Sequence, residues 1–245
     1  MIQFGLQPME WHSHQDLKYN FMLTKLCGFT DEESVKIAIA EKCDFLGFVF
    51  YDKSPRFISP ENAAIISAKI PPNIARVAVV VNPDQSLLQK ISEQFAPDFF
   101  QFHGDETVEF LKKVREKFPE IKIIKAFRIA SEKDLELVKN FENAADLFLF
   151  DAKIKEEFGG SGKKFDWKIL QNLSSKKDWF LSGGLNIENI EEALKITGAK
   201  LIDISSGIEK IRGKKSPELI EEFMRKIELT QSLPFASNFC GSKNF

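Results

Sequence analysis

The chain has 245 residues, of which 43% are hydrophobic and 29% are charged, as is usual for a globular protein with a full hydrophobic core. Its 34 basic and 36 acidic residues give a formal net charge of −2, which argues against a general nucleic-acid binder because such proteins carry a basic surplus. No apolar run approaches the roughly 20 residues of a membrane span. Three cysteines without paired spacing argue against a disulfide framework, and with no signal-peptide pattern at the start they favour the cytoplasm.

From residue 22 onward, short apolar runs alternate with amphipathic runs that begin at capping pairs such as Ser59-Pro60 and Ser216-Pro217. Strands are predicted at 22–26, 45–50, 75–81, 99–102, 121–126, 147–150, 180–181 and 201–203. Helices are predicted to begin near residues 31, 60, 84, 107, 132, 166, 184 and 217, the last one ending near 229. The strands show no alternation of apolar and polar residues, as expected when both faces of a parallel sheet are covered.

Eight successive strand–helix units over residues 22–229 predict an α/β fold, a single (β/α)8 TIM barrel. An open, doubly wound sheet is the alternative, but it would place a ligand at one switch point, whereas polar residues here follow many strands. Residues 1–21 are predicted to form an N-terminal extension and residues 230–245 a C-terminal tail. His12 and His14 in the extension are interpreted as solvated residues and not as metal ligands.

Two turns of small residues follow the last two predicted strands. Ser182-Gly183-Gly184 comes first and opens the predicted helix near residue 184, and Ser205-Ser206-Gly207 comes second. Glycines let the backbone approach a ligand closely, and backbone N–H groups at a helix start favour an anion. In (β/α)8 barrels a phosphate site is often built from the loops after strands seven and eight. The two turns therefore predict a phosphate cradle, although either turn alone would be an ordinary connection.

Side chains that follow the other strands are candidates for chemistry, because active residues of a barrel lie at the carboxyl ends of its strands. Cys27 follows the first strand, where nearby positive charge would favour its thiolate. Asp151 follows a fully apolar strand, where burial would favour the protonated carboxyl that a general acid needs. Arg56 could bind a carboxylate or a phosphate, and His103 could lie against an aromatic substrate. Asp203, in the last predicted strand, is expected to reach the open end of the barrel. Taken singly, such residues are more often structural.

Several motifs, in this order, resemble those of the phosphoribosylanthranilate isomerase family over about residues 22–229. The matching segments are Lys25-Leu26-Cys27-Gly28, Gly47-Phe48-Val49-Phe50, Ser54-Pro55-Arg56, Gln101-Phe102-His103-Gly104, Gly159-Gly160-Ser161-Gly162 with Phe165-Asp166-Trp167, Ser182-Gly183-Gly184-Leu185, and Asp203-Ile204-Ser205-Ser206-Gly207. Ser161 stands where the family usually has Thr, Arg212 where it often has Pro, and Ser216 where it often has Asp. These departures concern loops and a helix cap, so they bear little on the chemistry.

The resemblance implies a metal-free and cofactor-free Amadori rearrangement of a phosphosugar in tryptophan biosynthesis. The sequence leaves open whether the protein is a monomer or a homodimer. It implies that Cys27 is the general base at C2 of the sugar and Asp151 the general acid at the furanose ring oxygen. Arg56 would hold the anthranilate end, with His103 and Asp203 as further substrate-binding residues. Gly160 would join the phosphate-binding set of Gly183, Gly184, Ser205, Ser206 and Gly207.

Three alternatives remain at this point. A ProFAR-isomerase-type barrel would need carboxylates after strands one and five, but the first strand ends in Cys27. An indole-glycerol-phosphate synthase would need a catalytic lysine and glutamate set that is not found in matching positions. A phosphate-binding barrel without catalytic activity would need neither Cys27 nor Asp151.

Overall fold

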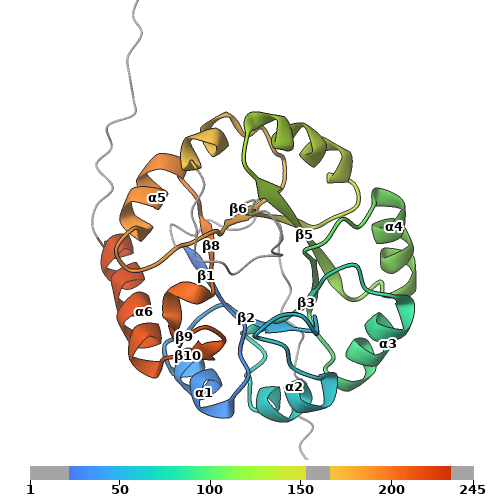
Figure 1. Ribbon diagram of the computed structural model, residues 1–245, viewed down its shortest axis with the longest axis horizontal. Helices are drawn as coiled ribbons and strands as arrows, with labels where there is room; N and C mark the ends of the chain where they lie inside the picture. The colour runs from blue at the N-terminus through green and yellow to red at the C-terminus, as the bar shows by residue number, and fades with distance from the viewer. Residues whose placement is uncertain (1–21, 153–165, 233–245) are drawn as a thin grey trace, which may run out of the picture.

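Residues 22–152 and 166–232 are described in the computed structural model, and they form a closed barrel of eight parallel strands paired in chain order. Figure 1 shows the strands at the centre and the helices as an outer ring. The strands are β1 (Leu23–Cys27), β2 (Phe45–Val49), β3 (Ala75–Val80), β4 (Phe99–Phe102), β5 (Lys122–Ile129), β6 (Leu147–Ala152), β7 (Trp179–Leu181) and β8 (Leu201–Ile204). The predicted TIM barrel is therefore confirmed.

Three of the helical segments within the described residues are 3-10 helices, of 10, 6 and 3 residues. In chain order the helices are α1 (Glu32–Ala40), α2 (Pro60–Ser67), α3 (Gln85–Gln94), α4 (Val108–Lys117), η1 (Glu132–Phe141), η2 (Trp167–Asn172), α5 (Ile190–Thr197), η3 (Ser206–Ile208) and α6 (Pro217–Ser232). The predicted caps at two of them are present, since Ser59 accepts a hydrogen bond from Asn62 N and Ser216 one from Leu219 N.

Two predicted helix bounds were wrong, and one hairpin was not predicted. The helix expected to open at Gly184 begins only at Ile190, because Asn186 and Asn189 stabilise a turn between them through side-chain hydrogen bonds. The last helix continues to Ser232, beyond the predicted end near 229. After η3, a small antiparallel hairpin of β9 (Glu209–Ile211) and β10 (Lys214–Lys215) was not predicted.

The barrel interior is filled by side chains of alternate strand residues. Phe45 lies at its centre, with its ring centroid 5.7 Å from that of Phe99 and 5.2 Å from that of Phe180, both in edge-to-face geometry. Val77 and Leu149 belong to the same buried cluster. This packed layer closes the floor of the barrel, so a ligand can enter only from one end.

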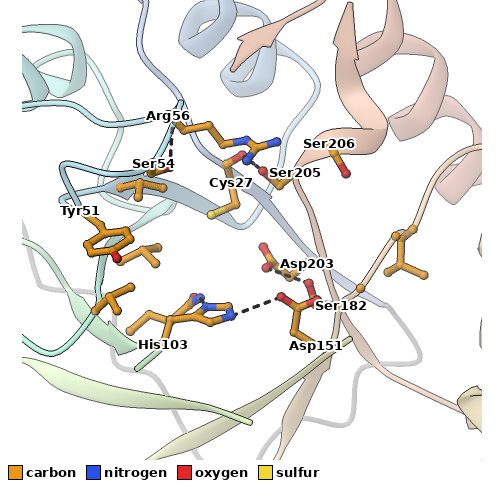
Figure 2. Close-up of a pocket in the computed structure, with 17 residues that line it drawn as sticks. Cys27, Tyr51, Ser54, Arg56, His103, Asp151, Ser182, Asp203, Ser205 and Ser206 are labelled. Atoms are coloured by element: carbon orange, nitrogen blue, oxygen red, sulfur yellow. Dashed lines mark hydrogen bonds and ion pairs between the residues drawn. The ribbon is translucent and has the colours of Figure 1, made fainter. Parts of the chain in front are cut away.

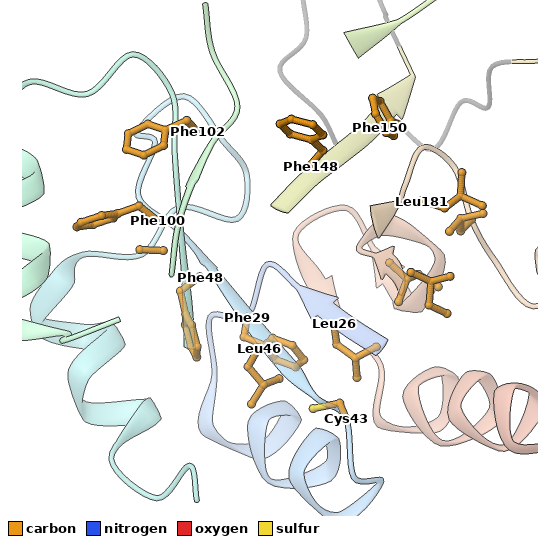
Figure 3. Packing of buried hydrophobic residues seen from close by; sticks show 14 of the residues in the cluster. Leu26, Phe29, Cys43, Leu46, Phe48, Phe100, Phe102, Phe148, Phe150 and Leu181 are labelled. Atoms are coloured by element: carbon orange, nitrogen blue, oxygen red, sulfur yellow. The ribbon is translucent and has the colours of Figure 1, made fainter. Parts of the chain in front are cut away.

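A second apolar layer lies between the strands and the helices. Figure 3 shows part of it, and the residues drawn include phenylalanines of β2, β4 and β6 as well as Leu26 and Cys43. Many of the 24 phenylalanines of the chain lie in this layer. Cys43 is buried in this layer, where burial raises the pKa of its thiol. It therefore behaves as a small apolar core residue.

None of the helices within residues 22–152 and 166–232 is long and apolar enough to cross a membrane.

Replacing Phe45 with Ala is expected to lower the free energy of unfolding by about 3–5 kcal/mol, because it removes the central ring of the interior layer and leaves a cavity. Phe57, which is 46% exposed, is the matched control, and Phe57→Ala should change stability by about 0.5 kcal/mol or less. Urea unfolding of the two variants measures the difference. Equal losses would show that the interior layer does not determine stability.

Candidate active site

A pocket opens at the carboxyl ends of the strands, and most of the residues predicted from the sequence line it. Figure 2 shows Cys27 and Asp151 facing one space, with Asp203 between them. The predicted residues in its lining are Cys27, Arg56, His103, Asp151, Gly183, Gly184, Asp203, Ser205 and Ser206. Gly207 does not line the pocket, and Gly160 lies outside the described residues. Side chains from β1, β4, β6 and β8 thus meet at one place.

Cys27 is the last residue of β1, and its side chain enters the barrel mouth opposite Gly47 of β2. A Cβ on Gly47 would lie 2.6 Å from the Cys27 Sγ and 3.1 Å from the Lys25 Nζ, so the missing side chain makes room for both groups. Burial raises the pKa of the Cys27 thiol, while Lys25 opposes this change. The next residue, Gly28, turns the chain away with φ of +90°.

Lys25 and Asp203 form a buried ion pair beneath the pocket. The Lys25 Nζ lies 2.8 Å from Asp203 Oδ1, and the two side chains are 0% and 5% exposed. Burial alone would lower the pKa of the Lys25 ammonium, but Asp203 and Cys27 more than offset it and raise that pKa. Ser182 donates a further hydrogen bond of 3.3 Å to Asp203 Oδ2. The pair therefore keeps a positive charge beside the thiol.

Asp151 is held by two groups in the wall of the pocket. Its Oδ1 accepts a hydrogen bond from Ala152 N at 2.8 Å, and its Oδ2 lies 3.2 Å from His103 Nε2. The other ring nitrogen of His103 lies 3.2 Å from Gln101 Nε2. These contacts fix the orientation of a nearly buried carboxyl group whose remaining surface faces the pocket. A carboxyl held in this way can exchange a proton with a bound ligand.

Arg56 reaches the pocket rim from the loop after β2, and its guanidinium forms a bidentate ion pair with Glu209. The Arg56 Nε and Nη2 lie 2.6 and 2.7 Å from the two carboxylate oxygens of Glu209. Glu209 also binds Lys215 Nζ at 2.8 Å, and Lys215 in turn donates to the carbonyl of Ser205. Burial lowers the pKa of Lys215 to about 8. This network joins the β2 loop to the turn after β8.

The two small-residue turns lie side by side at the mouth. Gly183 and Gly184 have φ of +88° and +69°, a backbone conformation that disfavours other residues. A Cβ on Gly207 would lie 2.1 Å from the Leu185 carbonyl oxygen, so this glycine lets the two turns pack together. Gly207 therefore allows the two turns of the predicted cradle to pack together, but it does not line the pocket itself.

Several lining residues were not singled out from the sequence. Tyr51, Ser54 and Ser182 follow strands, and Gln101 is the residue before the last of β4. Their position was therefore a usable signal, although Ser54, Gln101 and Ser182 were named only as parts of motifs. Glu209 carried no such signal, because its place depends on the hairpin after β8. Among the described residues, no group of three His, Cys, Asp or Glu side chains is arranged to hold a metal ion.

Comparisons with known proteins identify the family of this chain. The family model described as N-(5'-phosphoribosyl)anthranilate (PRA) isomerase matches residues 24–226. The enzyme of that name from Zymomonas mobilis is 41% identical over 207 residues, which is 84% of this chain and 98% of the relative. The corresponding protein of Parvibaculum lavamentivorans is 40% identical over 82% of this chain and 95% of its own length.

Solved structures of the same enzyme have the same fold. The phosphoribosyl anthranilate isomerase of Thermotoga maritima superposes with a TM-score of 0.77 at 33% identity, covering 85% of this chain and 99% of that one. A second structure, solved in complex with reduced 1-(o-carboxyphenylamino)-1-deoxyribulose 5-phosphate, gives a TM-score of 0.73 at 32% identity over the same shares of both chains. The chain therefore belongs to the N-(5'-phosphoribosyl)anthranilate isomerase family, the isomerases of tryptophan biosynthesis.

Proposed function

We propose that the pocket at the barrel mouth isomerises N-(5-phosphoribosyl)anthranilate to 1-(2-carboxyphenylamino)-1-deoxyribulose 5-phosphate, with Cys27 as general base and Asp151 as general acid. One observation carries this proposal: a thiol from β1 and a carboxyl from β6 line the same pocket. A barrel that only binds phosphate needs neither group, so their meeting favours catalysis over binding alone.

Asp151 would start the reaction by giving its proton to the furanose ring oxygen. The bond between C1 and that oxygen then breaks, and the nitrogen lone pair forms an iminium with C1. His103 and the Ala152 N–H support this role, because they hold both carboxyl oxygens in place. General acid catalysis of this kind contributes about 10²–10⁴-fold to a rate.

Cys27 would continue the reaction as its thiolate by removing the proton from C2, which the neighbouring iminium makes acidic. The electron pair of the C2–H bond forms the C1=C2 double bond, and the iminium becomes an enolamine. Tautomerisation of the enolamine gives the ketone product. Two groups on separate strands suit this division, since each acts at a different atom of one pentose.

The substrate would be held at its two ends. Ser205, Ser206, Gly183 and Gly184 form the phosphate cradle, and Arg56 lies at the rim for the anthranilate carboxylate. Glu209 binds the Nε and Nη2 edge of Arg56 and so fixes the guanidinium at the rim. The ligand of the solved relative combines a carboxyphenyl group and a phosphate, which supports this arrangement.

We keep the cytoplasm as the proposed location, which is supported by free Cys27 and Cys43 among the described residues. The proposed assembly is a monomer or a homodimer. A Thermotoga maritima relative is described as monomers generated from a dimeric enzyme.

Replacing Cys27 with Ser or Asp151 with Asn is expected to lower kcat about 10²–10⁴-fold, because each variant loses one proton-transfer group of the transition state. KM should change much less. Turnover of freshly made N-(5-phosphoribosyl)anthranilate measures both constants. Cys43→Ser, a change at a buried thiol outside the pocket, should keep kcat near the parent value. An unchanged kcat in either of the first two variants removes that residue from the mechanism.

The phosphate cradle is tested by a crystal of this protein soaked in sulfate or phosphate. We expect an anion between Gly184 and Ser206, held by backbone N–H groups and by the serine hydroxyl. Inorganic phosphate should also compete with substrate, raising KM without changing kcat. A cradle that stays empty in the crystal, with no competition in solution, would contradict the assignment.

A further inference from the structure

Lys25 is a buried charged group that the proposed mechanism does not use. It lies on β1 two residues before Cys27, so both side chains point to the same face of the strand, into the barrel. Lys25 pairs in register with Asp203 of β8, whereas Cys27 pairs with Gly47 of β2. The barrel thus surrounds the thiol with an ammonium below it, a carboxylate beside that ammonium, and a glycine opposite.

The glycine shows how close the thiol and the ammonium lie. Sγ and Nζ occupy the space that a Cβ on Gly47 would need, at 2.6 and 3.1 Å from that position. Nζ also lies 2.8 Å from Asp203 Oδ1. A lysine that is 0% exposed cannot turn its charge to solvent, so the charge acts on the groups around it.

We propose that Lys25 is a positioning residue for the general base: its ammonium, paired with Asp203, lies against the Cys27 side chain and stabilises the thiolate when the thiol gives up its proton. This inference rests on the proposed role of Cys27. A buried thiol is normally protonated, and a protonated thiol cannot remove the proton from C2. The ammonium next to Sγ offsets part of the cost of burying the thiolate.

Burial is the largest influence on the Cys27 thiol and keeps its pKa above the ordinary value, and Lys25 is the largest opposing influence. Asp203 also raises this pKa, by a smaller effect. Lys215, behind the Ser205 turn, also lowers the pKa of Cys27, by less than Lys25. The remaining titratable groups that share the pocket are Tyr51, Arg56, His103 and Asp151. Of these groups, Lys25 is the cation with the largest influence on the thiol.

The two members of the ion pair should change the thiol in opposite directions. Lys25→Met removes the charge that favours the thiolate, so ionisation of Cys27 should move to higher pH by roughly 1–3 units. Asp203→Asn removes a negative charge, so ionisation should move to lower pH by a smaller amount. The ultraviolet absorbance of the thiolate, taken as the difference between each protein and its Cys27→Ser counterpart, measures both shifts without substrate.

Lys125→Met is the matched control. Lys125 is also a buried strand lysine, paired with Glu106 at 2.8 Å, but it does not line the pocket. Its replacement should leave the Cys27 titration unchanged even if it destabilises the barrel. If Lys25→Met does not fold because it leaves the Asp203 carboxylate unpaired, the double variant Lys25→Met/Asp203→Asn replaces it. Comparing this double variant with Asp203→Asn gives the effect of Lys25 on the ionisation of Cys27. Ionisation should then be at higher pH in the double variant.

Enzyme kinetics give a second readout that a purely structural role would not produce. At neutral pH, kcat of Lys25→Met should fall at least 10-fold, and the deficit should shrink as the pH is raised and the thiolate forms. The role of Lys25 would be overturned if Lys25→Met did not change the pH at which the Cys27 thiol ionises. It would also be overturned if Lys25→Met shifted that pH in the same direction as Asp203→Asn. Since the titration needs no turnover, this result is distinguishable from failure of Cys27→Ser to reduce kcat, which would instead overturn the proposed function.

Discussion

The parallel pairing of β1 with β8 closes the barrel, and the site depends on it. The two strands are far apart in the sequence, yet their register places Lys25 opposite Asp203. Closure therefore brings opposite charges together in the nearly buried interior of the barrel, directly below the pocket that Asp203 also lines. A pair of this kind is costly to break because either partner alone would be a buried, uncompensated charge. The same contact sets the surroundings of Cys27.

A second charge network supports the rim of the same pocket. Arg56, Glu209 and Lys215 connect the loop after β2 with the hairpin after β8. Ser205 links this network to the first strand, because its hydroxyl donates to the Cys27 carbonyl at 2.9 Å. The side chains that would hold the substrate are thus fixed by elements from both ends of the chain. Such fixed groups lose little freedom when a ligand binds.

Much of the fold could be predicted because helix caps and apolar strands are local signals. Phe99–Phe102 was located to the residue, and most strand ends to within one or two residues. Residues at strand ends were also predictable as site candidates, since a barrel brings those ends together. The late start of α5 was missed because it depends on the turn between Asn186 and Asn189. The ion pair of Lys25 and Asp203 was missed because only the closed register brings the two together.

The central claim is that Cys27 and Asp151 act on opposite sides of one pentose anchored by its phosphate. A crystal structure of this protein with reduced 1-(o-carboxyphenylamino)-1-deoxyribulose 5-phosphate tests it most directly. We predict that Sγ of Cys27 lies in contact with C2, that the Asp151 carboxyl lies on the other side of the sugar, and that the phosphate rests on the turns after β7 and β8. A ligand bound with either group turned away from the pentose would contradict the account.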